Sequence, residues 1–194
     1  MNIGTYSYDD YLQLLQSFHG SLAPGLIIGG FMVELALKSF PKGELFNAIC
    51  ETSTCLPDAV QLLTVSTIGN GRLTILDFGR FAITFYGKDS GKGVRVYLDA
   101  SKLEKYPEIK SWYFKLKPKQ EQDSPLLLSQ MKEAGERILS LQRIRVEPAS
   151  LKRGKIGAVA PCPRCGEAYP LRTGNVCRAC QGESPYLEVT DYLA

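Results

Sequence analysis

The sequence predicts an α+β protein, in which a mixed core domain with an antiparallel meander packed on helices precedes a small cysteine-rich C-terminal module. Apolar residues recur at helical spacing in the first 40 residues, and three short β-rich segments separated by glycine turns follow. Helices and strands come partly in blocks, which favours α+β over an alternating α/β order. Of the 194 residues, 44% are hydrophobic and 22% are charged, which is enough apolar surface for one soluble core.

Two helices are predicted near the N-terminus. Ser7 caps a helix over residues 8–18, in which aromatic and leucine side chains recur at helical spacing. A proline suits the first turn of a second helix over residues 24–39. This second helix is apolar nearly all round and carries Gly29 and Gly30 in its middle, where each glycine costs roughly 1 kcal/mol of helix stability. We therefore predict a central, buried helix that another backbone approaches closely.

The middle of the chain predicts a strand, a helix and a meander. Residues 45–52 form the strand, and residues 53–67 form the helix, with Thr54 as its cap. A further helix is expected over residues 124–141, and a last strand over residues 143–148. Between these helices, three strands separated by glycine turns are expected to pair as an antiparallel meander. They span residues 73–79, 81–87 and 93–99.

A small, basic segment bounded by prolines divides the chain into two parts. Residues 148–161 are interpreted as a linker between a core domain, residues 1–147, and a C-terminal module, residues 162–194. Acidic and basic side chains cancel over residues 1–141, whereas residues 142–182 carry a net charge of +6 and the last twelve residues −3. The module is therefore modestly basic beside a neutral core.

This sequence lacks the signals of several classes of protein. No glycine-rich phosphate loop of the GxGxxG or GxxxxGK[ST] type opens a helix. The N-terminus has no basic start of a signal peptide, and the most apolar run, residues 22–33, is shorter than the ~20 residues of a membrane span. We therefore expect a cytoplasmic protein with no membrane partner, whose six cysteines are thiols or metal ligands rather than disulfides.

Four of the six cysteines form two CxxC pairs near the C-terminus. Cys162 and Cys165 are followed, after eleven residues, by Cys177 and Cys180. Both sulfurs of a CxxC pair face one point, and Gly166 lets the chain turn back. Two such pairs supply the four thiolates of a tetrahedral Zn²⁺ site with no open position for catalysis. We predict a structural zinc whose binding folds the module, with iron, two disulfides or a redox CxxC pair as alternatives.

Three arginines surround these cysteines and leave two interpretations open. Arg164, Arg172 and Arg178 either offset the thiolate charge and keep the module soluble, or form a contact surface for nucleic acid or an acidic partner. The only aromatic residues nearby, Tyr169 and Tyr186, are too few for a base-stacking platform. Nucleic acid is therefore the less favoured partner.

The remaining candidate side chains are His19, the only histidine, and the cysteines Cys50 and Cys55. Cys50 lies within a predicted strand and is expected in the core. Cys55 lies at the start of a predicted helix, where the helix N-terminus lowers the pKa of a thiol. His19 and Cys55 either meet as metal ligands or as a Cys–His pair, or are packed bystanders.

Four sequence blocks carry a family resemblance. In chain order they read FHGSLAPGLIIGGFMVELALK, ETSTCLPDAVQLLTVSTIGNGRL, DFGRFAITFY and GKGVRVYLD. They resemble the FmdE family, named after the E subunit of formylmethanofuran dehydrogenase, over roughly residues 14–100, and the four-cysteine tail resembles its longer members. The resemblance implies an α+β core, closely entwined dimers and a C-terminal treble-clef zinc finger. The dehydrogenase itself is a molybdenum or tungsten enzyme complex that fixes CO₂ as a formyl group on methanofuran.

The loop that contains His19 departs from the family pattern. Typical members read Phe-His-Gly-His-x-Cys-Pro-Gly, whereas this chain has Ser21 and Ala23 where the second His and the Cys would be. Cys55 and Asp58 match the family's Cys-x-x-Asp-Ala block. Because a catalytic zinc usually keeps three protein ligands, the resemblance implies only a weak second metal site in the core, held by His19 and Cys55 with Asp58 or Ser21 as a poor third ligand.

The predicted function follows from these features together. We expect a zinc-binding homodimer with an accessory, assembly or regulatory role, whose protein partner is a larger dehydrogenase complex of C1 metabolism. The apolar helix over residues 24–39 is expected at the dimer interface. One alternative is an enzyme that acts on a small carbonyl or C1 substrate through His19 and Cys55. The other is a zinc-finger regulator that binds nucleic acid. The prediction leans towards a protein that is not an enzyme.

Overall fold

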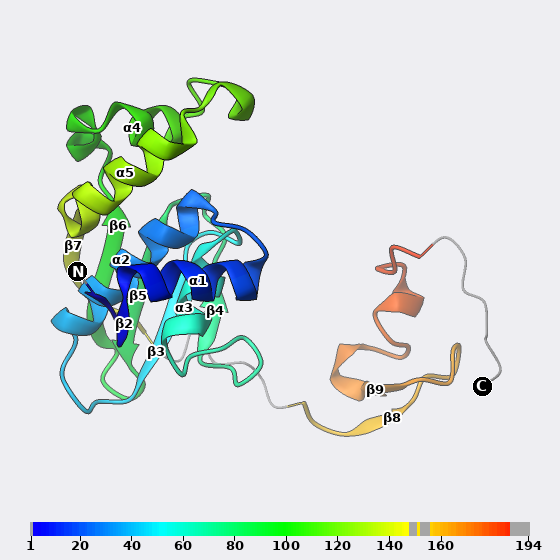
Figure 1. Ribbon diagram of the computed structural model, residues 1–194. Coiled ribbons are helices and arrows are strands. Elements are labelled where there is room, and N and C mark those ends of the chain that lie inside the picture. The colour runs from blue at the N-terminus through cyan, green and yellow to red at the C-terminus, as the bar shows by residue number, and fades with distance from the viewer. Residues whose placement is uncertain (1, 148–150, 152–155, 187–194) are drawn as a thin grey trace. The chain divides into compact units, whose positions relative to one another are not determined.

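The computed structural model describes residues 2–147, 151 and 156–186, which form two compact units (Figure 1). The first unit spans Met1–Leu151 and the second Lys152–Ala194. Of the expected linker, residues 148–150 and 152–155 lie outside the described residues. Its last three residues form strand β8 (Val159–Pro161), so the linker as predicted is too long at this end. These residues pair with the strand that follows the first two cysteines. The linker is predicted from its small residues and prolines, and that composition does not reveal this pairing.

A five-stranded sheet forms one layer of the first unit, in the order β4-β3-β5-β6-β7. Neighbouring strands are antiparallel except β3 and β4, which run parallel. The strands are β3 (Phe46–Cys50), β4 (Leu73–Ile75), β5 (Ala82–Gly87), β6 (Lys92–Leu98) and β7 (Leu139–Arg145).

The antiparallel meander is therefore β5-β6-β7, not the three strands expected from the sequence. The first expected strand, β4, instead lies at the sheet edge beside β3, with Ala48 opposite Leu73. Helix α3 (Leu56–Leu63) connects β3 to β4, and a parallel pair requires such a crossover. The third strand of the meander begins at Leu139, earlier than the predicted 143–148.

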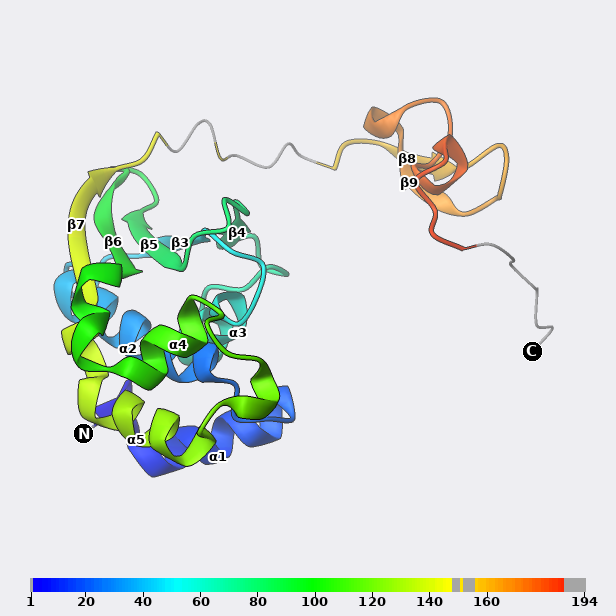
Figure 2. The ribbon, with the colours of Figure 1, turned by 90° about the horizontal axis from the view of Figure 1, so that it is seen from above.

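Helices cover one face of this sheet, with α2 nearest to it and α1 and α5 farther out (Figure 2). A short hairpin of β1 (Asn2–Ile3) and β2 (Tyr6–Ser7) precedes them. The larger helices are α1 (Tyr8–His19), α2 (Pro24–Ser39), α4 (Pro107–Tyr113) and α5 (Ser124–Ala134). The α+β class is confirmed, and α2 matches the predicted bounds.

Three local predictions about the helices are wrong. Helix α5 ends at Ala134 rather than at residue 141, because Gly135 adopts a φ of 51° and starts a 3₁₀ turn that leads into β7. Helix α3 begins after Cys55, and Thr54 is not its cap. Helix α4 lies in a stretch for which the sequence predicted no element, because seven residues are too few to show a clear helical period.

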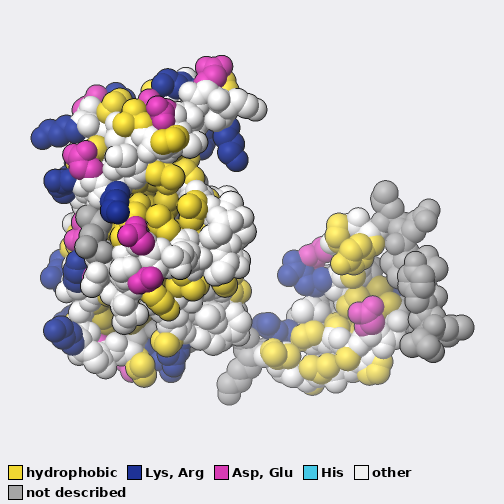
Figure 3. All heavy atoms as spheres, viewed as in Figure 1, with side chains coloured by type: hydrophobic (Ala, Val, Ile, Leu, Met, Phe, Trp, Pro, Cys, Tyr) yellow, Lys and Arg dark blue, Asp and Glu magenta, His cyan; other side chains and the backbone are white. Residues whose placement is uncertain are grey.

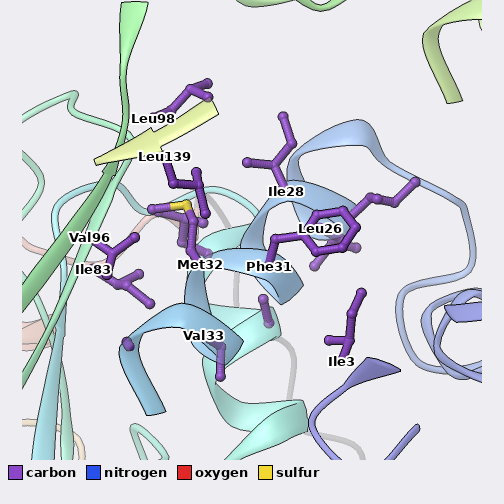
Figure 4. Packing of buried hydrophobic residues seen from close by; sticks show 14 of the residues in the cluster. Ile3, Leu26, Ile28, Phe31, Met32, Val33, Ile83, Val96, Leu98 and Leu139 are labelled. Carbon is purple, nitrogen blue, oxygen red and sulfur yellow. The ribbon is translucent and has the colours of Figure 1, made fainter. Parts of the chain in front are cut away.

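Helix α2 is the centre of the core, as predicted. Figure 4 shows Met32 facing Ile83 and Val96 of the sheet, whereas Phe31 points away from the sheet. The two central glycines allow close packing, because a Cβ atom at Gly29 would lie 2.8 Å from the Cβ of Ala59. Helix α2 is buried within one chain, so a second copy of the chain is not required to cover its apolar surface. The apolarity of α2 therefore no longer supports the expected homodimer.

In the second unit, the described residues form one hairpin and two short 3₁₀ turns. Strand β8 pairs with β9 (Ala168–Pro170), and turns follow at Leu171–Thr173 and Ala179–Gln181. Its only buried residues, among those described, are Cys162 and Tyr169. A unit with so little apolar interior requires another source of folding energy. In the described parts of both units, no helix is long and apolar enough to cross a membrane.

Candidate functional site

The four predicted cysteines come together in the second unit. Cys162 follows β8 directly, and the amide of Gly166, at a φ of +82°, donates a 2.8 Å hydrogen bond to the Cys162 carbonyl and turns the chain back. Cys177 lies two residues before the second 3₁₀ turn, and Cys180 lies within it. All four sulfurs lie within 4.8 Å of one another, and no other group of three or more His, Cys, Asp or Glu side chains in the described residues is comparably arranged.

The spacing of the sulfurs fits zinc. Tetrahedral Zn²⁺ with bonds of about 2.3 Å places its sulfur ligands roughly 3.8 Å apart. The Cys165 and Cys177 sulfurs are 3.7 Å apart. The amide of Cys177 donates to the Cys162 sulfur, and this hydrogen bond is the main cause that lowers the pKa of Cys162 to about 6. The arrangement forms a structural four-thiolate zinc site, in agreement with the predicted cofactor.

The polar contacts around the zinc site are structural. Arg164 donates to the Cys180 carbonyl at 2.9 Å, and Arg178 forms an ion pair with Glu183. The face shown in Figure 3 carries scattered basic side chains beside acidic ones, not a continuous basic stripe. Arg164 and Arg178 therefore make polar contacts within the finger. These contacts favour the interpretation that the arginines offset the thiolate charge and keep the module soluble, over a contact surface for a partner.

His19 ends helix α1 and contacts helix α3. Gly20 caps α1 with a φ of 78°, and the His19 Nδ1 atom lies 2.9 Å from Oδ2 of Asp58, in the first turn of α3. Asp58 thus occupies one ring nitrogen of the histidine. Among the described residues, His19 and Cys55 belong to no group of three metal-ligating side chains, and their sharing of a metal stays a prediction.

Cys55 occupies a strained turn between β3 and α3. Its φ of 57° and ψ of −53°, with a 2.6 Å hydrogen bond from the Leu56 amide to the Thr54 carbonyl, define the rare γ-turn that positive φ produces. Its sulfur packs so closely on Gly25 that a Cβ there would lie 2.8 Å away. This close approach explains why the start of α2 requires glycine at residue 25.

The electrostatic environment of Cys55 differs from the sequence prediction. Burial is the main cause that raises the pKa of this thiol, the Asp58 charge raises it further, and the Lys115 charge lowers it. The expectation of a lowered pKa at Cys55 is therefore wrong, because burial raises it. Cys50 is fully buried in β3 as predicted, and burial raises its pKa to about 12.

A cleft of about 1010 Å³ opens in the first unit beside Cys55. Ser21, Ala23 and Cys55 line it, whereas His19 does not. Cys55 therefore lines the cleft, whereas His19 contacts Asp58 in the first turn of α3.

Sequence reasoning missed another part of the cleft lining. Trp112 and Lys115 belong to α4 and the loop after it, which carried no predicted element. One sequence signal was available, because Trp112 is the only tryptophan of the chain and lies among tyrosine, phenylalanine and lysine residues.

Comparison with known proteins places both units. The family model described as "FmdE, Molybdenum formylmethanofuran dehydrogenase operon" matches residues 18–145, and "FmdE treble clef zinc finger" matches residues 153–187. A crystal structure of a tungsten formylmethanofuran dehydrogenase FmdE-like protein from Syntrophus aciditrophicus is 50% identical, with a TM-score of 0.88, covering 96% of this chain and 98% of that one.

A curated relative from Archaeoglobus fulgidus, named "Probable S-adenosyl-L-methionine-binding protein", is 30% identical over 188 residues. The match covers 86% of this chain and 51% of that protein, so the chain spans about half the length of this relative.

Proposed function

The chain belongs to the FmdE family, and on that premise we propose that it is a homodimeric accessory protein whose zinc finger contacts a protein partner in C1 metabolism. The supporting observation is the contrast between a complete four-thiolate site in the finger and a core in which, over the described residues, His19 and Cys55 belong to no cluster of three ligating side chains. This contrast favours an assembly or regulatory role over metal catalysis in the core. We further propose a cytoplasmic location.

Metal content tests the core of this proposal. We expect one zinc per chain after mild chelation, with the same content in a His19→Ala variant. Cobalt substitution is expected to give a single thiolate absorption band that His19→Ala leaves unchanged. Two tightly bound metals per chain, one of them lost in His19→Ala, would show a catalytically competent core site and overturn the accessory role. Light scattering tests the dimer, and a monomer at micromolar concentration would contradict it.

A second candidate function is an enzyme that uses Cys55, favoured by the strained turn that presents this residue to the cleft. A nucleophilic role would require an activated thiolate, whereas burial raises the pKa of Cys55. The candidate predicts that iodoacetamide modifies Cys55 rapidly at pH 7. Slow modification that accelerates as the pH rises above 9 would favour the accessory role instead.

The name of the Archaeoglobus relative raises S-adenosylmethionine as a ligand. That molecule carries a sulfonium and an ammonium against one carboxylate, so its net charge is positive. The cleft is lined by Arg80, Lys115, Lys117 and Lys119 and by no acidic side chain. We therefore do not propose S-adenosylmethionine for this cleft. The nucleic-acid alternative predicts an affinity that falls steeply with salt, and the engaged arginines of the finger do not favour it.

A further inference from the structure

The lining of the core cleft combines two kinds of side chain, aromatic and basic. Three aromatic rings form a cluster, in which the Phe81 and Trp112 centroids are 6.3 Å apart at an interplanar angle of 86°, and Tyr113 lies 6.1 Å from Trp112. All three rings are partly exposed and line the cleft. Half-exposed rings beside a cavity of this size offer faces and edges to a planar ligand.

The charged side chains of the lining are all positive. Arg80 is paired with Glu51 at 2.8 Å and Lys117 with Glu108 at 3.1 Å. Lys115 and Lys119, which also line the cleft, have no carboxylate partner within residues 2–147 or 156–186. The Lys115 ammonium lies 5.3 Å from the centre of the Trp112 ring. Two ammonium groups without a carboxylate partner in one cleft lining form a site for a negative charge.

The backbone supports this use of the cleft. Only two non-glycine residues of the described chain have positive φ values, Cys55 at 57° and Lys115 at 55°. Both line the same cleft from different segments, and Ser21 and Gln122 add polar groups to its wall. Conformations of this kind are energetically costly and concentrate where a ligand is bound.

We propose that this cleft binds a small organic anion that carries a planar ring, with a carboxylate or phosphate held by Lys115 and Lys119 and the ring placed against Trp112. Arg80 adds a fixed positive charge at the cleft, although Glu51 neutralises it in part. Ligand binding here is independent of the zinc finger, because every lining residue belongs to the first unit. The outcome of a ligand-binding experiment therefore does not decide the proposed accessory role, which has a separate test.

Trp112 makes the proposal measurable, because it is the only tryptophan and lies in the cleft. The probes are adenosine 5′-monophosphate, which has a ring and a phosphate; adenosine, which has the ring alone; and inorganic phosphate, which has the charge alone. A second ring-bearing anion, 8-anilinonaphthalene-1-sulfonate, tests the cleft with a different ring, so that the result does not depend on the fit of adenine alone. The full chain is titrated at low salt with excitation at 295 nm, and the fluorescence of Trp112 gives each Kd.

We expect both ring-bearing anions to quench Trp112, and adenosine 5′-monophosphate to bind about tenfold more tightly than adenosine or phosphate, as one charge-assisted contact predicts. The double variant Lys115→Asn/Lys119→Gln is expected to remove this advantage, since asparagine tolerates the positive φ at residue 115. Lys88→Gln, an exposed lysine outside the cleft, is the matched control and should bind like the native chain.

Three outcomes would overturn the proposal. The first is no quenching by either ring-bearing anion in a chain with a native circular dichroism spectrum. The second is equal affinity for adenosine and its monophosphate. The third is an equal loss of affinity in the control Lys88→Gln and in the cleft variant, which would reflect overall charge rather than a site. A thermal melt of each variant checks that the fold is retained.

Discussion

The finger brings its four sulfurs together from residues 162–180, whereas the core cleft is assembled from segments spread between residues 21 and 128. The finger buries almost nothing and depends on bonds to one ion, while the core buries a continuous apolar cluster around α2. The difference teaches that one chain can build a site by local ligation or by long-range packing. The two constructions should then fail under different perturbations.

Removing one zinc ligand should have the largest effect, confined to the finger. We expect Cys165→Ser to release the metal and unfold the finger, because metal binding supplies the folding energy of such a module. The unfolding transition of the core should stay unchanged. Zinc content and limited proteolysis measure the two effects. Cys55→Ser is the matched control, since it removes a cysteine outside the finger and should retain one zinc. A finger that stays folded without metal would refute the distinction between a finger held by metal ligation and a core held by packing.

The core should be most sensitive at a buried ion pair. Glu51, with 7% of its side chain exposed, accepts hydrogen bonds from Arg95 Nε at 2.7 Å and Nη2 at 2.9 Å. We expect Glu51→Gln to lower the free energy of unfolding of the core by about 3 kcal/mol, because it leaves the partly buried Arg95 charge without a carboxylate partner. Glu104→Gln, at an exposed pair, is the control and should change little.

The same ion pair predicts a pH dependence. The hydrogen bond from Arg95 is the main cause that holds the pKa of Glu51 below its ordinary value of 4.5. The stabilisation is therefore present above pH 4.5 and is lost as the pH falls through the lowered pKa. Denaturant unfolding at several pH values should show the native chain and Glu51→Gln converging in strongly acid solution. A constant difference down to pH 2 would contradict this assignment.

Close packing in the core predicts a smaller effect. A Cβ atom at Gly30 would lie 2.5 Å from the ring of Tyr11, whose hydroxyl donates to the Leu26 carbonyl at 2.9 Å. We expect Gly30→Ala to destabilise the core by about 1–3 kcal/mol through overpacking, and to leave zinc content unchanged. Gly69→Ala is the control, because its nearest neighbouring atom would be 3.9 Å away. Equal melting temperatures for the two variants would argue against the tight contact between α1 and α2.

The smallest effect is expected at His19. Its contact with Asp58 joins two partly exposed side chains, so His19→Ala should cost about 0.5 kcal/mol of core stability. A chemical denaturation curve measures this loss, and Phe18→Ala, at a neighbouring exposed position, serves as the comparison. If His19→Ala instead lowers core stability by several kcal/mol, and does so only in zinc-loaded protein, His19 binds a metal. The core would then depend on metal binding, as the finger does.

The sequence by itself determined the finger and the central helix. Two CxxC pairs with Gly166 specify a zinc site because the ligands are close in the chain, so that local geometry alone directs four sulfurs to one point. Helix α2 could be placed from Pro24 to Ser39 because its proline start and apolar length are also local features. The blocks of sequence that resemble the FmdE family pointed to the matched family.

Tertiary structure alone decided the sheet order, the environment of Cys55 and the cleft. The parallel pairing of β4 with β3 depends on where α3 packs, which no periodicity in a three-residue strand expresses. The direction of the Cys55 pKa shift depended on burial against Gly25 and on charges contributed by Asp58 and Lys115. Segments distant in the chain meet only when the core packs, so a site that they share leaves no spacing to be recognised in the sequence.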